Sequence, residues 1–342
     1  MTDLTQAATG RRGRKVLVTH DRIAPSAIDL LNANDIDVYF SPPYTPSDEV
    51  AARCAKLGVD AIMVRQGKIN AAVINASPAL KVIVKHGVGV DNVDIEAATA
   101  RDVPVLRSMG SNALAVAEHT IALVLTLLKQ IARLDRATKD GEWLKSGFIG
   151  RDIAGSVIGL VGFGSIGRET SRLAKALGMQ VLVFDPMAPD AARQFGFALA
   201  DSLDELLAEA DIVSLHCPLT TETRNLIDAR RLAQMKPDAL LVNTARGGII
   251  DEAALFDALR EERIGGAALD SFGVEPPAAN SPLWSLNNLI VTPHVAGVTK
   301  GSAIQMAETA ARHIIAVLDG NPPDSRSIAH ASELSASGEE LI

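Results

Sequence analysis

The chain has 342 residues, of which 47% are hydrophobic and only 4% are aromatic, and it carries a formal net charge of −8. This length favours two domains with aliphatic cores, and the negative charge argues against general binding of nucleic acid or of a membrane surface. Two cysteines, Cys54 and Cys217, form no disulfide framework and lack metal-ligand spacing, so we expect a cytoplasmic protein with no metal site and no membrane-spanning helix.

The first part of the chain, residues 15–107, alternates aliphatic runs with helical patterns. Such alternation predicts parallel strands covered by helices. The predicted strands are 15–19, 37–40, 61–64, 81–84 and 103–106, and the predicted helices are 25–32, 47–57, 70–74 and 94–101. Residues 1–13 are basic but lack the apolar region of a signal peptide, so we expect a disordered arm there.

A long helix is predicted over 113–139, and its central residues are almost wholly apolar. We therefore expect this helix to be buried where the chain crosses between domains. A loop over 140–151 follows it. Much later, an amphipathic helix over 301–318 is expected to return the chain to the first domain, and the Ser-, Ala- and Glu-rich residues 324–342 are expected to form a loose tail.

Residues 155–185 have the pattern of a dinucleotide-binding unit: a strand over 157–161, a glycine turn, a helix, a second strand and an acid. The turn reads Gly162-Phe163-Gly164-Ser165-Ile166-Gly167. In such a turn Gly162 permits the tight bend, Gly164 lets the backbone approach a pyrophosphate, and Gly167 lets the helix pack on the strand. The N-terminus of the helix then attracts the phosphates.

The acid of this unit, Asp185, predicts which dinucleotide binds. Its carboxylate follows the strand over 180–184 and can accept a hydrogen bond from a ribose 2′-hydroxyl, whereas it repels a 2′-phosphate. The next residues, Pro186 and Met187, offer no positive charge to a phosphate. We therefore expect NAD rather than NADP.

The remaining strands of this second region, predicted over 212–215, 240–243, 266–269 and 289–292, end in polar segments. Arg246, Glu275 and His294 each follow one of the last three strands. Because open parallel sheets bind ligands at the carboxyl ends of their strands, we expect these side chains to lie together. An arginine can bind a carboxylate bidentately, and a histidine oriented by a glutamate can exchange a proton near neutral pH.

Each of these residues alone has a commoner structural explanation: a surface ion pair, a solvated loop glutamate or a structural histidine. Their order behind a dinucleotide turn is more specific. The motifs that contain them are GLVGFGSIG with VLVFDP, SLHCPLTTETRNLI, KPDALLVNTARGGIIDEAAL, AALDSFGVEP and LIVTPHVAG. In these motifs, and over about residues 15–320, the chain resembles the D-isomer-specific 2-hydroxyacid dehydrogenases, most closely the D-3-phosphoglycerate dehydrogenase branch.

The resemblance implies two Rossmann-like, doubly wound α/β domains with an active-site cleft between them. Residues 1–111 with 298–342 would bind the substrate, and residues 112–297 would bind NAD. Arg246 would bind the substrate carboxylate and carbonyl, Glu275 would pair with the histidine, and His294 would act as acid and base in hydride transfer at C2 of a D-2-hydroxy acid. The implied NAD contacts are Gly162, Gly164, Ser165, Ile166, Gly167, Asp185, Cys217, Thr244, Ala245, Asp270, His294 and Gly297.

Two further features follow from the same resemblance. Ser271 and Gly273 stand where the family usually has Val and Glu, and we expect Gly273 to loosen the loop that leads to Glu275. The family also implies a homodimer, built here on the apolar helix 113–128 and the loop 143–148. The alternative is that this helix is buried wholly within one subunit.

Three basic residues bear on the choice of substrate. Arg65 and Lys85 match the basic residues with which the phosphoglycerate branch holds a phosphate, and Lys145 matches one donated by a neighbouring subunit; the alternative is that all three are ordinary surface charges. The turn Gly87-Val88-Gly89 is expected to bind the substrate carboxylate together with Arg246. His86 is expected only to pack.

Three functions therefore stay open. The first is a dehydrogenase acting on 3-phosphoglycerate and phosphohydroxypyruvate. The second is a glyoxylate or hydroxypyruvate reductase that uses the same residues. The third is an NAD-sensing binding protein similar to the corepressors with this fold.

Overall fold

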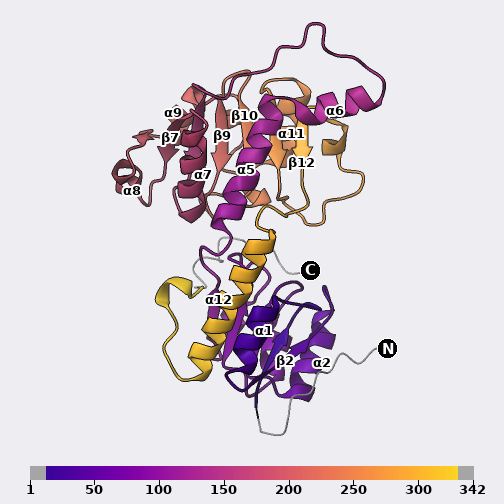
Figure 1. Ribbon diagram of the computed structural model, residues 1–342, viewed down its shortest axis with the longest axis vertical. Helices are drawn as coiled ribbons and strands as arrows, with labels where there is room; N and C mark the ends of the chain where they lie inside the picture. The colour runs from indigo at the N-terminus through magenta and orange to yellow at the C-terminus, as the bar shows by residue number, and fades with distance from the viewer. Residues whose placement is uncertain (1–12, 330–342) are drawn as a thin grey trace. The chain divides into compact units, whose positions relative to one another are not determined.

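The computed structural model describes residues 13–329, and the chain divides into two compact units (Figure 1). One unit combines the residues up to Asn112 with those from Thr299 onward, and the other is Ala113–Val298. Each unit is built on its own all-parallel sheet, which confirms the predicted α/β fold class. The disordered arm predicted at 1–13 lies almost entirely outside the described residues.

The first unit contains a five-stranded sheet in the order β2-β1-β3-β4-β5. Its central strands are buried on both faces, which explains their continuous aliphatic sequences. The strands are β1 (Arg14–Val18), β2 (Ile36–Phe40), β3 (Ala61–Val64), β4 (Val82–Lys85) and β5 (Val105–Arg107). The helices are α1 (Pro25–Asn32), α2 (Ser47–Leu57), α3 (Ala71–Ala76), α4 (Ile95–Thr99) and α12 (Lys300–Leu318). α1 and α12 contribute to the core on one face of the sheet, and α2, α3 and α4 contribute to the core on the other.

The end of the first unit corrects one prediction. Residues 324–329 do not form part of a loose tail, because η3 (Ser325–Ser327) is followed by an antiparallel bridge between Ile328 and Leu106. The Ala329 N–H donates to the Val105 carbonyl at 2.9 Å, and Ala329 is buried. This segment therefore covers the outer edge of β5. The rest of the predicted tail lies outside the described residues.

The second unit contains a seven-stranded sheet in the order β12-β11-β10-β9-β6-β7-β8. The strands are β6 (Val157–Val161), β7 (Gln180–Phe184), β8 (Ala198–Leu199), β9 (Ile212–Leu215), β10 (Leu240–Asn243), β11 (Gly266–Leu269) and β12 (Leu289–Val291). The helices are α5 (Ala113–Leu128), α6 (Ile131–Lys139), α7 (Ser165–Ala176), α8 (Pro189–Gln194), α9 (Leu203–Glu209), α10 (Ala229–Leu232) and α11 (Glu252–Arg260), with η1 (Gly247–Ile249) and η2 (Pro282–Ser285). Strand order reverses between β6 and β9, and such a switch point is where open α/β sheets bind ligands.

The single long helix predicted over 113–139 is wrong. The chain forms two helices, α5 and α6, whose axes differ by 59°. Gln130 lies between them with φ 50°, a left-handed conformation that ends the helix without a glycine or a proline. α5 packs into the core on one face of the sheet, whereas α6 has no buried residue.

Among the residues the structure describes, no single helix has both the length and the apolar character to cross a bilayer. The bent pair α5 and α6 meets those criteria only when its two members are taken together.

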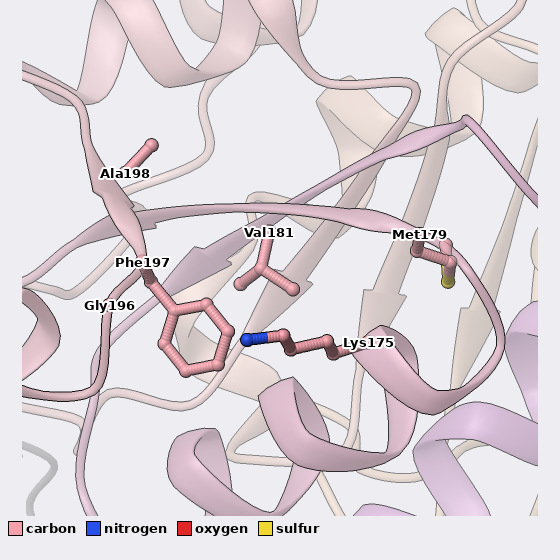
Figure 2. A pocket seen from close by; sticks show the side chains of 6 residues that line it. All are labelled: Lys175, Met179, Val181, Gly196, Phe197 and Ala198. Carbon is pink, nitrogen blue, oxygen red and sulfur yellow. The ribbon is translucent and has the colours of Figure 1, made fainter.

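A cavity of about 170 Å³ lies beside β7 and β8 (Figure 2). Its walls include Lys175 and Phe197, and the Lys175 Nζ lies 5.5 Å from the centre of the Phe197 ring. Met179 and Val181 place it at the start of β7, whereas the glycine turn follows the end of β6. The cavity therefore does not belong to the ligand-binding edge of the sheet.

Candidate active site

The glycine turn between β6 and α7 has two glycines that the fold itself requires. A Cβ on Gly162, which has φ +99°, would lie 2.8 Å from the backbone of His216, and one on Gly167 would lie 2.5 Å from the Gly162 carbonyl oxygen. A Cβ on Gly164, in contrast, would meet no atom within 4 Å. The space beside Gly164 is thus not filled by this unit, and it adjoins the start of α7.

The start of α7 fits the phosphates of a dinucleotide. Gly164 is the N-cap residue and provides no side-chain cap, so the helix has no side-chain acceptor at its first turn. Backbone N–H groups and the positive end of the helix dipole can bind an anion at such a position. The predicted contacts Ser165 and Ile166 are the first two residues of this helix.

Asp185 lies at the end of β7, and its carboxylate holds the glycine turn. It accepts hydrogen bonds from the backbone N–H of Phe163 at 2.7 Å, of Met187 at 2.9 Å and of Ala188 at 3.2 Å. A carboxylate has about four acceptor positions, so one position is left for a ribose hydroxyl. Asp185 can therefore order the turn and also bind a nucleotide.

The other predicted cofactor residues follow β9 and β10. Burial raises the pKa of the Cys217 thiol to about 11, so the thiol stays protonated at neutral pH. Its neighbour His216 hydrogen-bonds Ser214 at 3.0 Å, and burial lowers the pKa of this imidazole to about 4. Both side chains are therefore uncharged near neutral pH and line the carboxyl end of β9 without adding charge there.

Arg246 is placed by the loop that follows β10. The Asn243 side chain donates to the Arg246 carbonyl at 2.8 Å and accepts from the Ala245 N–H at 3.0 Å, which ties this loop to the strand. The Arg246 guanidinium donates to the Ala245 carbonyl at 2.8 Å. Its charge also acts on Glu275, where it contributes to lowering the carboxyl pKa.

His294 and Glu275 form a direct pair, with Nδ1 of the imidazole 2.7 Å from Oε2 of the carboxylate. Because a carboxylate can only accept, Nδ1 carries a proton and Nε2 is the nitrogen of the neutral ring that can take one up. The side chains are 47% and 35% exposed, respectively, so solvent or a ligand can reach them. Partial burial alone would raise the pKa of Glu275, but its hydrogen bonds with His294 and the Phe272 N–H outweigh burial and lower it.

The loop that carries Glu275 is held from two sides, which corrects the expectation that Gly273 loosens it. The Phe272 N–H donates to Glu275 Oε1 at 2.9 Å, and the Gly273 N–H donates to Oε1 of Glu252 at 2.6 Å. Glu252 is the first residue of α11 and has no role in the sequence prediction. Gly247 packs against the same loop, since a Cβ there would lie 1.8 Å from the Phe272 carbonyl carbon.

Asp270 holds the loop that carries His294. It is 1% exposed, and its carboxylate accepts hydrogen bonds from the Thr292 hydroxyl at 2.5 Å, the Val295 N–H at 2.9 Å and the Ala296 N–H at 2.8 Å. The predicted NAD contact of Asp270 stays a prediction. The predicted contact Gly297 follows directly after this loop.

The predicted substrate residues lie in the first unit, at the ends of β3 and β4. Arg65 follows β3, and Lys85 ends β4, where its ammonium donates to Asn92 Oδ1 at 2.8 Å. The turn Gly87-Val88-Gly89 comes next. His86 is buried, and burial together with the charges of Arg65 and Lys85 lowers its pKa to about 4. A neutral, buried imidazole agrees with a packing role.

The chain is similar to known proteins in family, in sequence and in structure. Residues 121–296 match the family model "D-isomer specific 2-hydroxyacid dehydrogenase, NAD binding domain". A D-3-phosphoglycerate dehydrogenase of Archaeoglobus fulgidus is 39% identical over 310 residues, which are 90% of this chain and 58% of that protein. An (S)-sulfolactate dehydrogenase of Chromohalobacter salexigens is 44% identical over 248 residues, which are 72% of this chain and 80% of that protein.

A solved structure is similar to this chain over nearly its whole length. The TT0316 protein of Thermus thermophilus superposes with a TM-score of 0.82 at 35% identity, over 92% of this chain and all of that one. Against the D-3-phosphoglycerate dehydrogenases it matches, however, the chain spans only 48–58% of their length.

Proposed function

Because this chain belongs to the D-isomer specific 2-hydroxyacid dehydrogenase family, we propose that it is an NAD-dependent enzyme that interconverts a D-2-hydroxy acid and the corresponding 2-keto acid. The observation that carries the proposal is the 2.7 Å pair of His294 and Glu275, with Arg246 close enough to act on the glutamate. These residues follow strands of the same parallel sheet as the glycine turn.

The residues divide the chemistry as follows. NAD supplies a hydride acceptor at its nicotinamide when it is bound. Nε2 of His294 takes the proton of the substrate hydroxyl as the C2–H bond breaks, and in the reverse direction it returns that proton to the carbonyl oxygen. Glu275 stabilises the imidazolium so formed. Arg246 binds the carboxylate and stabilises the negative charge that develops on the carbonyl oxygen.

For the substrate we propose a three-carbon 2-hydroxy acid with an anionic group at C3, with 3-phosphoglycerate as the first candidate. The names of the two curated relatives share this chemistry, since sulfolactate carries a sulfonate where phosphoglycerate carries a phosphate. Their different stereochemical labels describe one spatial arrangement, because sulfur raises the priority of C3 above the carboxyl carbon. One active site could therefore deliver hydride to the same face of either keto acid.

Charge in the first unit supports an anionic C3 group. Arg65 and Lys85 lie at the ends of adjacent, directly paired strands. Burial lowers the pKa of Arg65, and the positive charge of Arg22 lowers it further. A bound phosphate or sulfonate would offset this repulsion between the two arginines. We propose Arg65 and Lys85 as its ligands, and the Gly87-Val88-Gly89 turn as a ligand of the carboxylate.

The test is the initial rate of NADH oxidation with phosphohydroxypyruvate, sulfopyruvate, hydroxypyruvate and glyoxylate. We expect the two anionic C3 substrates to have the higher kcat/KM. Arg65→Gln is expected to raise KM for those two by about 10–100-fold, the value of a charge-assisted hydrogen bond, and to leave KM for hydroxypyruvate unchanged. A higher kcat/KM with glyoxylate or hydroxypyruvate would instead support a glyoxylate or hydroxypyruvate reductase. Turnover of none would support an NAD-sensing binding protein.

The preference for one nicotinamide cofactor depends on Asp185. Asp185 and the uncharged residues after it are expected to give NADH a higher kcat/KM than NADPH, because the carboxylate repels a 2′-phosphate. Steady-state kinetics with both cofactors at a fixed keto acid measures this. An equal or higher kcat/KM with NADPH contradicts the assignment of Asp185.

The open space beside Gly164 also bears on cofactor binding. Gly164→Ala is expected to raise the Kd for NADH, because the methyl group enters the space next to α7 where a pyrophosphate would lie, while Tm changes little. Fluorescence titration of NADH and a thermal melt measure both effects. Gly301→Ala in α12 is the matched control, since a Cβ there also meets no atom within 4 Å. Unchanged NADH binding by the Gly164 variant would remove this turn from the cofactor site.

We also propose a homodimer formed through the predicted loop 143–148 and through α6, which precedes it. The other element predicted at the interface, α5, packs into the core of its own unit. A cavity of about 290 Å³ is lined by Leu134, Thr138, Trp143, Leu144, Lys145 and Phe148. Trp143 is 76% exposed and Ile149 is 86% exposed, and apolar residues that cluster on a surface in this way are typical of protein interfaces. The same interface would bring Lys145 to the partner subunit.

Light scattering at micromolar concentration is expected to give twice the mass of the chain. Trp143→Ser with Ile149→Ser is expected to shift the protein toward the monomer, because it removes exposed apolar surface that the partner would cover. Met187→Ser, at another highly exposed apolar residue, is the control. A monomeric wild type would contradict the dimer.

A further inference from the structure

The helix α5 contacts the two loops that carry Arg246 and His294 through consecutive residues. His119 Nε2 lies 3.1 Å from Thr292 Oγ1, and the Thr120 hydroxyl lies 2.8 Å from the Thr244 hydroxyl. Thr292 comes two residues before His294, and Thr244 comes two residues before Arg246. One turn of α5 is thus joined to the start of both loops.

The hydrogen bonds at His119 have a defined direction. The Thr292 hydroxyl has one proton, and it donates that proton to Oδ1 of the buried Asp270 at 2.5 Å. Its oxygen can therefore only accept from His119, which places a proton on His119 Nε2. His119 Nε2 also lies 3.8 Å from Asp270 Oδ1. The His119 imidazole thus donates to Thr292, and Thr292 donates to the Asp270 carboxylate that holds the His294 loop.

The loop that carries His294 needs this support because His294 has an unfavourable backbone conformation. His294 has φ 53°, a left-handed conformation that is unfavourable for a residue other than glycine. Three donors from Thr292, Val295 and Ala296 converge on Asp270 around this residue. The hydrogen bonds to Asp270 therefore fix the backbone conformation in which the His294 imidazole reaches Glu275. His119 supports these bonds through its contact with Thr292.

The contact at Thr120 has a similar direction. The Thr120 hydroxyl donates to the Val116 carbonyl at 2.8 Å, so the Thr244 hydroxyl donates to Thr120. Both threonines are buried. The end of β10 is in this way held to the same helix turn as the end of β12.

From this geometry we infer that His119 and Thr120 are positioning residues that set Arg246 and His294 at a fixed distance from each other. This inference rests on the proposed dehydrogenase function. His119 acts through Thr292 and Asp270 on the proton-transferring imidazole, and Thr120 acts through Thr244 on the carboxylate-binding arginine. The two contacts therefore affect different kinetic constants.

The experiment compares a disruptive and a conservative variant at each position. His119→Leu removes the donor and is expected to lower kcat by about 10–100-fold through misplacement of His294, with KM for the keto acid little changed. His119→Gln restores an N–H donor and is expected to recover most of the loss. Thr120→Val is expected to raise KM for the keto acid about tenfold, the value of one hydrogen bond, and Thr120→Ser to restore it.

Thr126→Val is the matched control for Thr120→Val. Thr126 also lies on α5 and also donates its hydroxyl to the carbonyl four residues before it, that of Ala122 at 2.7 Å, but the hydroxyl is exposed. Its replacement is expected to leave kcat and KM unchanged. Should His119→Leu fail to fold, Thr292→Val against Thr292→Ser tests the same donor chain.

The outcomes separate the two claims. Wild-type kcat in His119→Leu, or equal losses with leucine and glutamine that follow a fall in Tm, would overturn the positioning role, because packing alone gives that result. Failure of the proposed function is seen earlier and differently: the wild type would turn over no keto acid with NADH, and the positioning role would fall with it.

Discussion

Replacing His294 by alanine is expected to lower kcat by about 10²–10⁴-fold, the usual contribution of general acid–base catalysis. NADH binding is expected to change little, because His294 is one of many predicted cofactor contacts and the main ones, the Gly162–Gly167 turn and Asp185, follow other strands. Stopped-flow or steady-state rates and an NADH titration measure the two effects separately. His313→Ala, on α12 of the first unit, is the control histidine and is expected to keep wild-type activity.

Glu275→Gln tests the partner of that histidine. Glutamine can still hydrogen-bond the imidazole, but it removes the charge that stabilises the imidazolium. Because the pKa of Glu275 is lowered, its carboxylate is charged near neutral pH, so the variant removes a charge that is present there. The reduction direction, which starts from protonated His294, is expected to lose most as the pH rises, and oxidation is expected to lose less. An active His294→Ala enzyme with an unchanged pH profile would remove this pair from the mechanism.

Gly247→Ala is expected to impair both stability and activity. The new methyl group would collide with the backbone of Phe272 and Gly273, so the loop over 270–275 or η1 must move. Overpacking of this kind costs about 1–3 kcal/mol. The shift also displaces the Phe272 N–H that binds Glu275 and the adjacent Arg246, so kcat/KM is expected to fall about 10²-fold.

The neighbouring glycine supplies the control. A Cβ on Gly248 would meet the Leu219 side chain at 3.1 Å, and a leucine side chain can move where a backbone cannot. Gly248→Ala is therefore expected to keep most of the activity and most of the melting temperature. If both alanine variants behave alike, the close contact with Phe272 does not position Glu275.

Local signals in the sequence were sufficient for the framework of the nucleotide unit. The aliphatic strands and the glycine turn follow from patterns within a few residues, and the parallel sheet then brings the strand ends that carry Arg246, Glu275 and His294 to one edge. That Glu275 pairs with His294 was predicted from the family resemblance. The adjacency of β11 and β12, which the two residues follow, agrees with their contact.

Other features have no signal in the local sequence pattern and could not be predicted from it. Gln130 ends α5 in a left-handed conformation although neither glycine nor proline marks the position. Glu252 reads as an ordinary first-turn acid of a helix, and only the structure shows that it holds Gly273. His119 sits within an apolar helix, and its contact to Thr292 joins residues 173 positions apart.

The docked segment at Ile328 has a consequence for solubility. β5 is the outermost strand of its sheet, and an uncovered outer strand offers backbone groups with which another chain can pair. The Ile328 bridge and the Ala329 N–H occupy such groups on Leu106 and Val105. A chain cut before residue 324 would lose this cover, and we expect it to associate through strand-to-strand pairing even though every α-helix and β-strand of both units remains intact.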